Sequence, residues 1–126
     1  MATPLVNEGT TAQFSCSFVD HTGAAISDTA ISAISATLRD VASNQIINSR
    51  NSQDVLNTNC GTLASGGGFT LILTGSADNV SVLGAGTNQL RRLTLSVIYA
   101  TGTLSTEFTY VLRDLVDMSN VFVIGP

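Results

Sequence analysis

The fold is decided by residues 90–112, which read LRRLTLSVIY, ATGT and LSTEFTYVL in turn. Apolar and polar residues alternate on both sides of the short middle segment, so that Leu93, Leu95 and Val97 share one face of the first half. Alternation of this length is typical of strands with one buried face, and residues 100–103, with their glycine, are typical of a turn. The sequence therefore predicts a β-hairpin of strands 90–99 and 104–112.

Further alternating runs lie upstream of this hairpin. One covers residues 11–19 and another residues 69–74, and turn residues follow or precede them at positions 20–23 and 65–68. Shorter strands are expected around residues 45–48 and 61–64, and the polar stretch 49–59 is expected to be an ordered loop with a short strand in it. The inward side chains of the two main runs are Ala12, Phe14, Cys16, Phe18, Phe69, Leu71 and Leu73.

Residues 31–39 admit two interpretations. Ile34, Ala36 and Leu38 alternate with polar residues as in a strand, although the stretch 30–36 has the small side chains that a helix also accepts. Long-side-chain helix formers are lacking and Ser, Thr and Ile dominate, which favours the strand.

Together these segments predict an all-β fold: an antiparallel, immunoglobulin-like β-sandwich of about seven short strands. The chain has 126 residues, the usual size of one domain. We assign residues 10–115 to the sandwich, residues 1–9 to an N-terminal arm and residues 116–126 to an apolar C-terminal tail. The absence of tryptophan disfavours an antibody-type domain.

The charge balance excludes two classes of partner. Charged residues make up 11% of the chain, lysine is absent, and the net charge is −4. A phosphate-binding surface needs clustered Lys or Arg, so nucleic acid is not expected as a ligand, and the same balance argues against an anionic membrane surface. No basic segment followed by an apolar run opens the sequence, so we expect no secretory signal.

The reactive residue types are too few to predict catalysis. Cys16 and Cys60 are expected as reduced thiols, with a disulfide as the alternative, and together with His21 they are too few for a zinc site. His21 lies in a turn without a nucleophile pattern beside it, and the glycine segments 65–68 and 84–86 lack the lysine of a phosphate loop. The sequence predicts neither an enzyme nor a cofactor.

Contacts with partners are expected chiefly at the two ends of the chain. The tail carries four consecutive apolar residues that either fold back as an edge strand or add to a neighbour's sheet. Arg91 shares the inward parity of Leu93, so we expect it at a sheet edge or reaching a partner. The candidate interaction residues are Leu5, Val6, Arg91, Val121, Phe122, Val123 and Ile124.

The most distinctive segment, residues 44–57, reads NQIINSRNSQDVLN. With residues 18–26 before it, Asp78-Asn79 after it, and Arg113 and Leu115 near the end, it resembles a family of small structural proteins of tailed bacteriophages. Relatives in that family often carry glycine after the asparagine, where this chain has Ser49, so a tight turn at that position stays open.

This resemblance implies an immunoglobulin-like domain built into a virion, as a capsid decoration (cement) protein. The implied partners are the major capsid protein or other virion proteins and further copies of the chain, with assembly in the host cytoplasm. A head–tail or tail accessory protein is the alternative within the virion. A module that recognises host-surface glycans is the alternative of another class.

Overall fold

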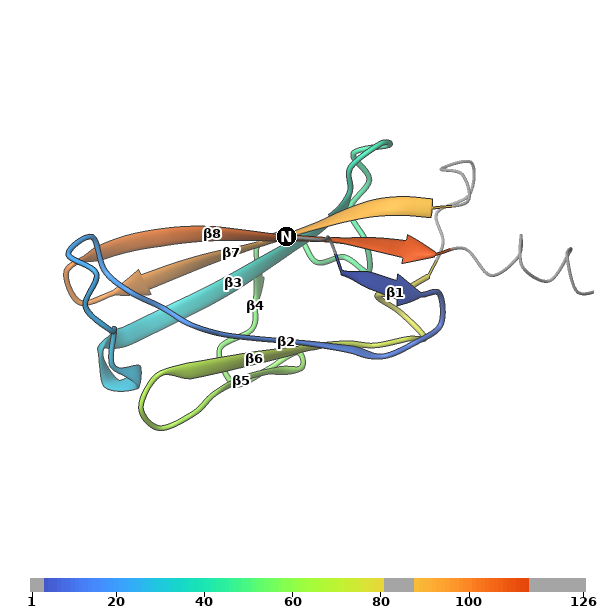
Figure 1. Ribbon diagram of the computed structural model, residues 1–126. Coiled ribbons are helices and arrows are strands. Elements are labelled where there is room, and N and C mark those ends of the chain that lie inside the picture. The colour runs from blue at the N-terminus through green and yellow to red at the C-terminus, as the bar shows by residue number, and fades with distance from the viewer. Residues whose placement is uncertain (1–3, 81–87, 114–126) are drawn as a thin grey trace, which may run out of the picture.

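The computed structural model describes residues 4–80 and 88–113, and the strands in this part carry nearly all of its regular structure (Figure 1). A single short 3-10 turn, η1 (Asp28–Ala30), precedes the longest strand of the first half. The strands are β1 (Leu5–Asn7), β2 (Ala12–Ser17), β3 (Ile31–Asp40), β4 (Gln53–Asp54), β5 (Gly61–Leu63), β6 (Gly68–Leu73), β7 (Asn88–Tyr99) and β8 (Gly102–Arg113). The prediction of an all-β fold is confirmed.

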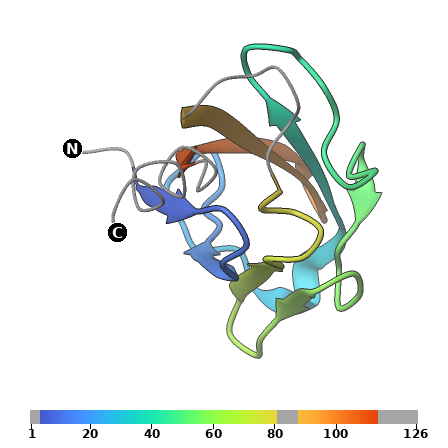
Figure 2. The same ribbon diagram turned by 90° about the vertical axis from the view of Figure 1, so that its right-hand side faces the viewer.

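The strands form two sheets that face each other (Figure 2). One sheet has five strands in the order β1-β8-β7-β3-β4, and the other has three in the order β2-β6-β5. All pairs are antiparallel except β1 with β8, which run parallel. The expectation of purely antiparallel pairing is therefore wrong at this edge.

The predicted hairpin is present as β7 and β8. Leu93 lies opposite Phe108 and Tyr99 opposite Gly102. The loop of the hairpin is therefore residues 100–101, shorter than the expected turn of residues 100–103. Leu93 and Val97 are fully buried, whereas Ile98, of the opposite parity, is 49% exposed. The alternation read from the sequence therefore marks the buried face correctly.

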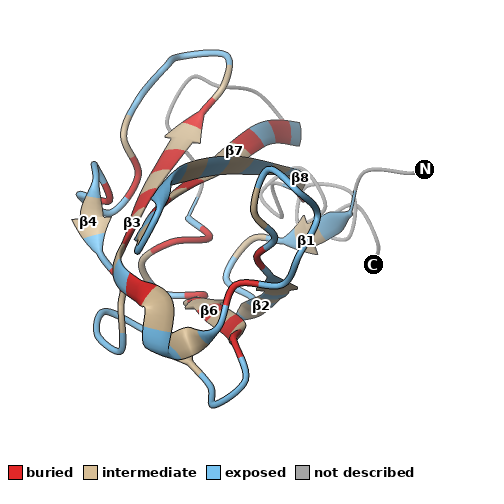
Figure 3. Ribbon diagram, turned by 90° about the vertical axis from the view of Figure 1, so that its left-hand side faces the viewer, coloured by how far each residue is buried: buried red, intermediate tan, exposed pale blue. Residues whose placement is uncertain are grey.

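Residues 31–40 form strand β3, so the helical alternative is wrong. β3 pairs with β7 on one side and with β4 on the other, and a register shift interrupts the β7 pairing between Ile31 and Ala33. Buried side chains recur at every second position along β3 and β7, as the striped colouring of Figure 3 shows. Pairing with β7 along nearly the whole strand, and with β4 at Ser35 and Ala36, holds this segment in the strand conformation that its propensity favours.

The core lies between the two sheets. Side chains of β3, β7 and β8 meet those of β6 and of the segment around β2. The rings of Phe14 on β2 and Tyr110 on β8 meet across the interior, with centroids 5.5 Å apart, and Phe18 lies 5.9 Å from Phe69 on the β2–β6 side. Both cysteines are free thiols; Cys16 is half-buried and Cys60 is exposed.

The N-terminal segment differs from the expected arm. Leu5–Asn7 pairs with Val111–Arg113, and the N–H of Glu8 donates to the carbonyl of Arg113 over 2.9 Å. Val6 packs against the core, so this segment belongs to the sheet rather than to a separate arm. The predicted tail, residues 116–126, lies outside the described residues.

The segment between β3 and β5 is an ordered loop whose backbone turns repeatedly through the left-handed region. The short strand expected near residues 45–48 is reduced to a single bridge between Arg39 and Ile46, and β4 supplies the strand expected in the loop. The residues with positive φ here are Asn44, Asn48, Ser49, Ser52, Asn57, Asn59 and Cys60. Asparagine tolerates this conformation better than most residues, which explains the asparagine-rich composition.

The sequence left undecided whether the chain makes a tight turn at Ser49, and the structure shows that it does. Asn48 and Ser49 have φ values of 53° and 56°, and the N–H of Arg50 donates to the carbonyl of Ile47 over 3.0 Å. Two consecutive left-handed residues define a type I′ turn, whose preferred sequence is Asn-Gly.

Replacing Ser49 by glycine is therefore expected to raise the free energy of unfolding by about 0.5–1 kcal/mol, because glycine carries no steric penalty at positive φ. Ser105, an exposed residue within β8, serves as the matched control. Ser105→Gly is expected to lower stability by about 0.5–1 kcal/mol, since glycine weakens a strand interior. Urea unfolding of both variants measures the two changes; losses of equal size would contradict a strained turn at Ser49.

Candidate functional site

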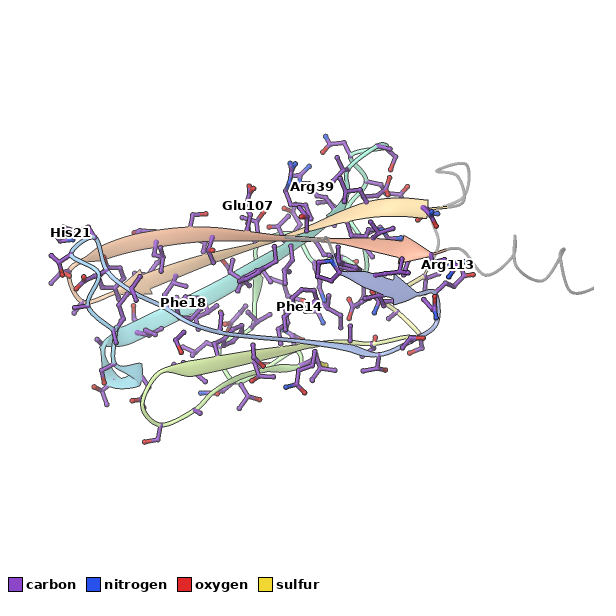
Figure 4. The ribbon with its side chains drawn as sticks, in the orientation of Figure 1. Phe14, Phe18, His21, Arg39, Glu107 and Arg113 are labelled. Atoms are coloured by element: carbon purple, nitrogen blue, oxygen red, sulfur yellow. The ribbon has the colours of Figure 1, made fainter. Side chains whose placement is uncertain are left out.

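The side chains able to do acid–base or metal chemistry are dispersed over the described part of the chain. No group of three or more His, Cys, Asp or Glu side chains in residues 4–80 and 88–113 is placed to hold a metal ion. His21 is exposed at the tip of the turn after β2 (Figure 4). Its neighbour Asp20 accepts hydrogen bonds from Thr22 and Ala24, and the bond from the Thr22 hydroxyl is the main cause that lowers the pKa of that carboxyl.

The polar groups that do converge lie inside the molecule. Figure 2 shows the connection after β6, in yellow, turning inward between the sheets. This connection brings Asp78 and Asn79, both fully buried, to side chains from elsewhere in the chain. We call Arg50, Asp78, Asn79, Arg91 and Tyr110 the buried polar cluster.

Arg50 and Asp78 form the first contact of the cluster. The Nε of Arg50 donates to Oδ1 of Asp78 over 2.7 Å, and its Nη2 donates to Oδ2 over 3.2 Å. Asp78 also accepts from the Asn48 amide and from the backbone N–H of Thr74. Burial by itself raises the pKa of Asp78, but these hydrogen bonds outweigh it and hold the pKa below its usual value.

Arg91, on β7, is fully buried and binds the backbone of the connection between β6 and β7. Its guanidinium donates to the carbonyls of Asp78 and Val80 over 3.1 and 2.6 Å. The Nε of Arg91 lies 3.7 Å from Oδ1 of Asp40, a carboxyl that is itself fully buried. Burial lowers the pKa of Arg91, against the opposing influence of Tyr110 and Asp40.

Asn79 and Tyr110 complete the cluster. The Tyr110 hydroxyl donates to the side-chain carbonyl of Asn79 over 2.8 Å, and the Asn79 amide donates to the carbonyl of Thr10 over 2.7 Å. Burial raises the pKa of Tyr110 to about 12. These bonds join β8, the β6–β7 connection and the segment before β2, so the cluster cross-links distant parts of the chain inside the molecule.

The sequence-predicted interaction residues are dispersed by the structure. Leu5 is 57% exposed on the edge strand β1, whereas its neighbour Val6 packs inward. Arg91 is fully buried on β7, an inner strand between β8 and β3, so it lies neither at a sheet edge nor where it could reach a partner, and the prediction is wrong. The remaining candidates, Val121, Phe122, Val123 and Ile124, lie outside the described residues.

Sequence reasoning missed the buried polar cluster, although one signal pointed to it. Arg91 occupies the inward parity of β7, which places a charge in the core and requires a buried partner. No local pattern identified Arg50 and Asp78 as members of the cluster, because these two contacting residues are 28 positions apart in the sequence.

Comparison with known proteins adds no assignment: no protein-family model matches the chain, and no curated protein matches it. The resemblance drawn from residues 44–57 therefore stays a prediction. Within residues 4–80 and 88–113, no helix has the length and apolarity to cross a bilayer.

Proposed function

We propose that this chain is a non-catalytic structural protein of a tailed-phage virion, a capsid decoration protein that binds the shell and its own copies. The observation that carries the proposal is where the described residues place some of their charged and large apolar side chains. Arg50, Arg91, Asp40 and Asp78 are buried, while large apolar side chains are exposed at Leu5, Val19, Val80, Leu90 and Ile98.

This distribution suits a protein that is covered by neighbours. Long charged side chains are normally kept at the surface, where they hinder association. A surface low in charge has less to desolvate when two proteins meet, and the cores of protein interfaces are depleted in charged residues. The buried polar cluster stiffens the domain internally, which lowers the ordering cost of assembly.

The strand order supports the finer proposal of an immunoglobulin-like sandwich. The four-strand run β8-β7-β3-β4 corresponds to the G-F-C-C′ order of a variable-type domain, and β2-β6-β5 corresponds to B-E-D. β7 carries no cysteine opposite Cys16 and the chain has no tryptophan, so the hallmarks of antibody domains are absent. This architecture recurs among assembly modules but does not by itself imply a function.

Immunogold electron microscopy on purified phage particles, with antibodies raised against this chain, tests the proposal. Regularly spaced labelling over the head is expected. Labelling confined to the neck or tail would favour the accessory-protein alternative over decoration. A chain found in the soluble lysate and missing from washed particles would overturn the virion proposal altogether.

Glycan recognition receives less support. A polar surface depression is lined by Asn48, Gln53, Asn59, Thr74 and Ser76 beside the buried Arg50. Sugar-binding sites commonly add an aromatic ring that stacks on the sugar, and none of the described lining residues is aromatic.

A further inference from the structure

One flank of the molecule carries an apolar groove between the two sheets. Its walls are the end of β2 and the first half of β8, and Figure 4 shows Phe18 pointing from the β2 side toward the opposite sheet. The lining residues are Cys16, Ser17, Phe18, Val19, Leu104, Thr106 and Phe108. None of them is charged.

The groove lies where two sheet edges remain uncovered in the described part of the chain. β2 pairs with β6 alone, and β1 covers β8 only at Val111–Arg113. The β8 side chains along the groove are only half-buried at Leu104 and Phe108, although their partners across the hairpin, Val97 and Leu93, are fully buried. The interior is therefore less fully covered on this flank than beneath β7.

Edges of this kind accept an added strand. An extended segment supplies backbone hydrogen bonds to the open edge, and its alternate side chains fill the apolar groove. The segment must be apolar and free of charge to match this lining. Residues 118–126 read MSNVFVIGP, contain no charged residue, and include the four-residue apolar run 121–124.

The geometry favours the tail of a second copy over the protein's own tail. Reversing the chain after Arg113 takes about four residues, which leaves three residues, or at most about 11 Å, before Val121. Phe108, at the near end of the groove, lies five residues back along β8, which is about 16 Å. The protein's own tail could therefore bring only its last residues, from about Val123 on, alongside this end, and could not seat the whole run 121–124 in the groove. In addition, β1 already occupies the β8 edge beside Arg113.

We propose that the groove between β2 and β8 binds residues 121–124 of a second copy of this chain as an added strand. The inference deepens the assembly role proposed above by naming the segment and the surface through which copies join. Each copy has one groove and one tail, so the contact can close into a ring or continue along a lattice. Either arrangement suits a shell protein.

Cys16 provides a native reporter inside the groove. In full-length protein carrying Cys60→Asn, which removes the exposed thiol and places a residue tolerant of positive φ at that position, one further cysteine is introduced into the tail. Oxidation is carried out at about pH 9 because burial raises the pKa of the Cys16 thiol. The four single variants are Val121→Cys, Phe122→Cys, Val123→Cys and Ile124→Cys.

A strand presents alternate residues to one side, so the expected result is an alternating pattern. One pair of variants, 121 with 123 or 122 with 124, should form disulfide-linked dimers and longer chains about five-fold more efficiently than the other pair. Adding Cys16→Ala should abolish these products. Native light scattering should show an oligomer for the unmodified chain and a monomer when both residues of the cross-linking pair are replaced by aspartate (Val121→Asp/Val123→Asp or Phe122→Asp/Ile124→Asp), with unchanged melting temperature.

Three outcomes would overturn the inference. Equal yields at all four positions would indicate random collision, and no cross-linking at any position would show that the tail does not enter the groove. A disulfide formed within one chain would show that the protein's own tail is the occupant. Because the assay uses purified protein alone, each of these results leaves the association with virions to be judged separately by immunogold labelling.

Discussion

Replacing Arg50 by methionine is expected to lower the free energy of unfolding by about 3–5 kcal/mol, which is the usual loss when one partner of a buried ion pair is removed. Arg50 is 3% exposed and Asp78 is fully buried. Without the guanidinium, the Asp78 carboxylate keeps its desolvation cost and loses both hydrogen bonds from a charged donor. Urea unfolding at neutral pH measures the change.

The exposed pair of Arg92 and Glu107 supplies a matched control. Its two side chains are 43% and 58% exposed, and the closest N–O distance is 3.8 Å. Arg92→Met is expected to change stability by less than about 1 kcal/mol, because solvent screens such pairs. The double variant Arg50→Met/Asp78→Asn should recover part of the loss, since it removes the stranded charge. Equal effects of Arg50→Met and Arg92→Met would contradict a structural role for the buried pair.

The same ion pair makes stability depend on pH. The folded-state pKa of Asp78 lies below the ordinary value of 3.8, so its contribution is complete above that value and is lost as the pH falls through the folded-state pKa. In Arg50→Met, fewer hydrogen bonds oppose the effect of burial on Asp78, so the pKa of this carboxyl rises and it binds a proton more readily. The stability difference between the unmodified protein and this variant is therefore expected to narrow between pH 7 and pH 3.

The Gly61→Ala variant is expected to lose about 3 kcal/mol of stability through overpacking. Gly61 begins β5, and a Cβ atom there would overlap the carbonyl oxygen of Val55. Backbone atoms, unlike the end of a flexible side chain, cannot move aside without displacing Val55, which is fully buried in the core. Thermal and urea unfolding would both show the loss.

Gly68 is the control for this substitution. It begins β6 in the same sheet, its φ is not positive, and a Cβ atom there would meet nothing within 4 Å. Gly68→Ala should therefore stay within about 0.5 kcal/mol of the unmodified protein. If both alanine variants fold with equal stability, the close approach of Gly61 to Val55 is not maintained in solution.

Several features followed from local sequence. Alternation identified β2, β3, β6 and the β7–β8 hairpin, because a strand with one buried face must repeat every two residues. The ordered loop between β3 and β5 was also expected, although asparagine-rich composition did not predict which residues adopt positive φ. The N-terminal segment was misjudged, since three residues carry too little pattern to reveal pairing with a distant strand.

The sequence by itself determined that the fold is all-β, the burial parity of each main strand and the scarcity of charge. Tertiary structure decided which strands lie at edges, that β1 pairs in parallel with β8, and that Arg91 turns toward Asp40 and the β6–β7 connection rather than toward a partner. The physical reason is the range of the forces involved. Strand periodicity is set by neighbouring residues. A buried charge is instead satisfied by whatever partners the packed chain brings to it, and these can lie far away in the sequence, as Asp40 does from Arg91 and Asp78 from Arg50.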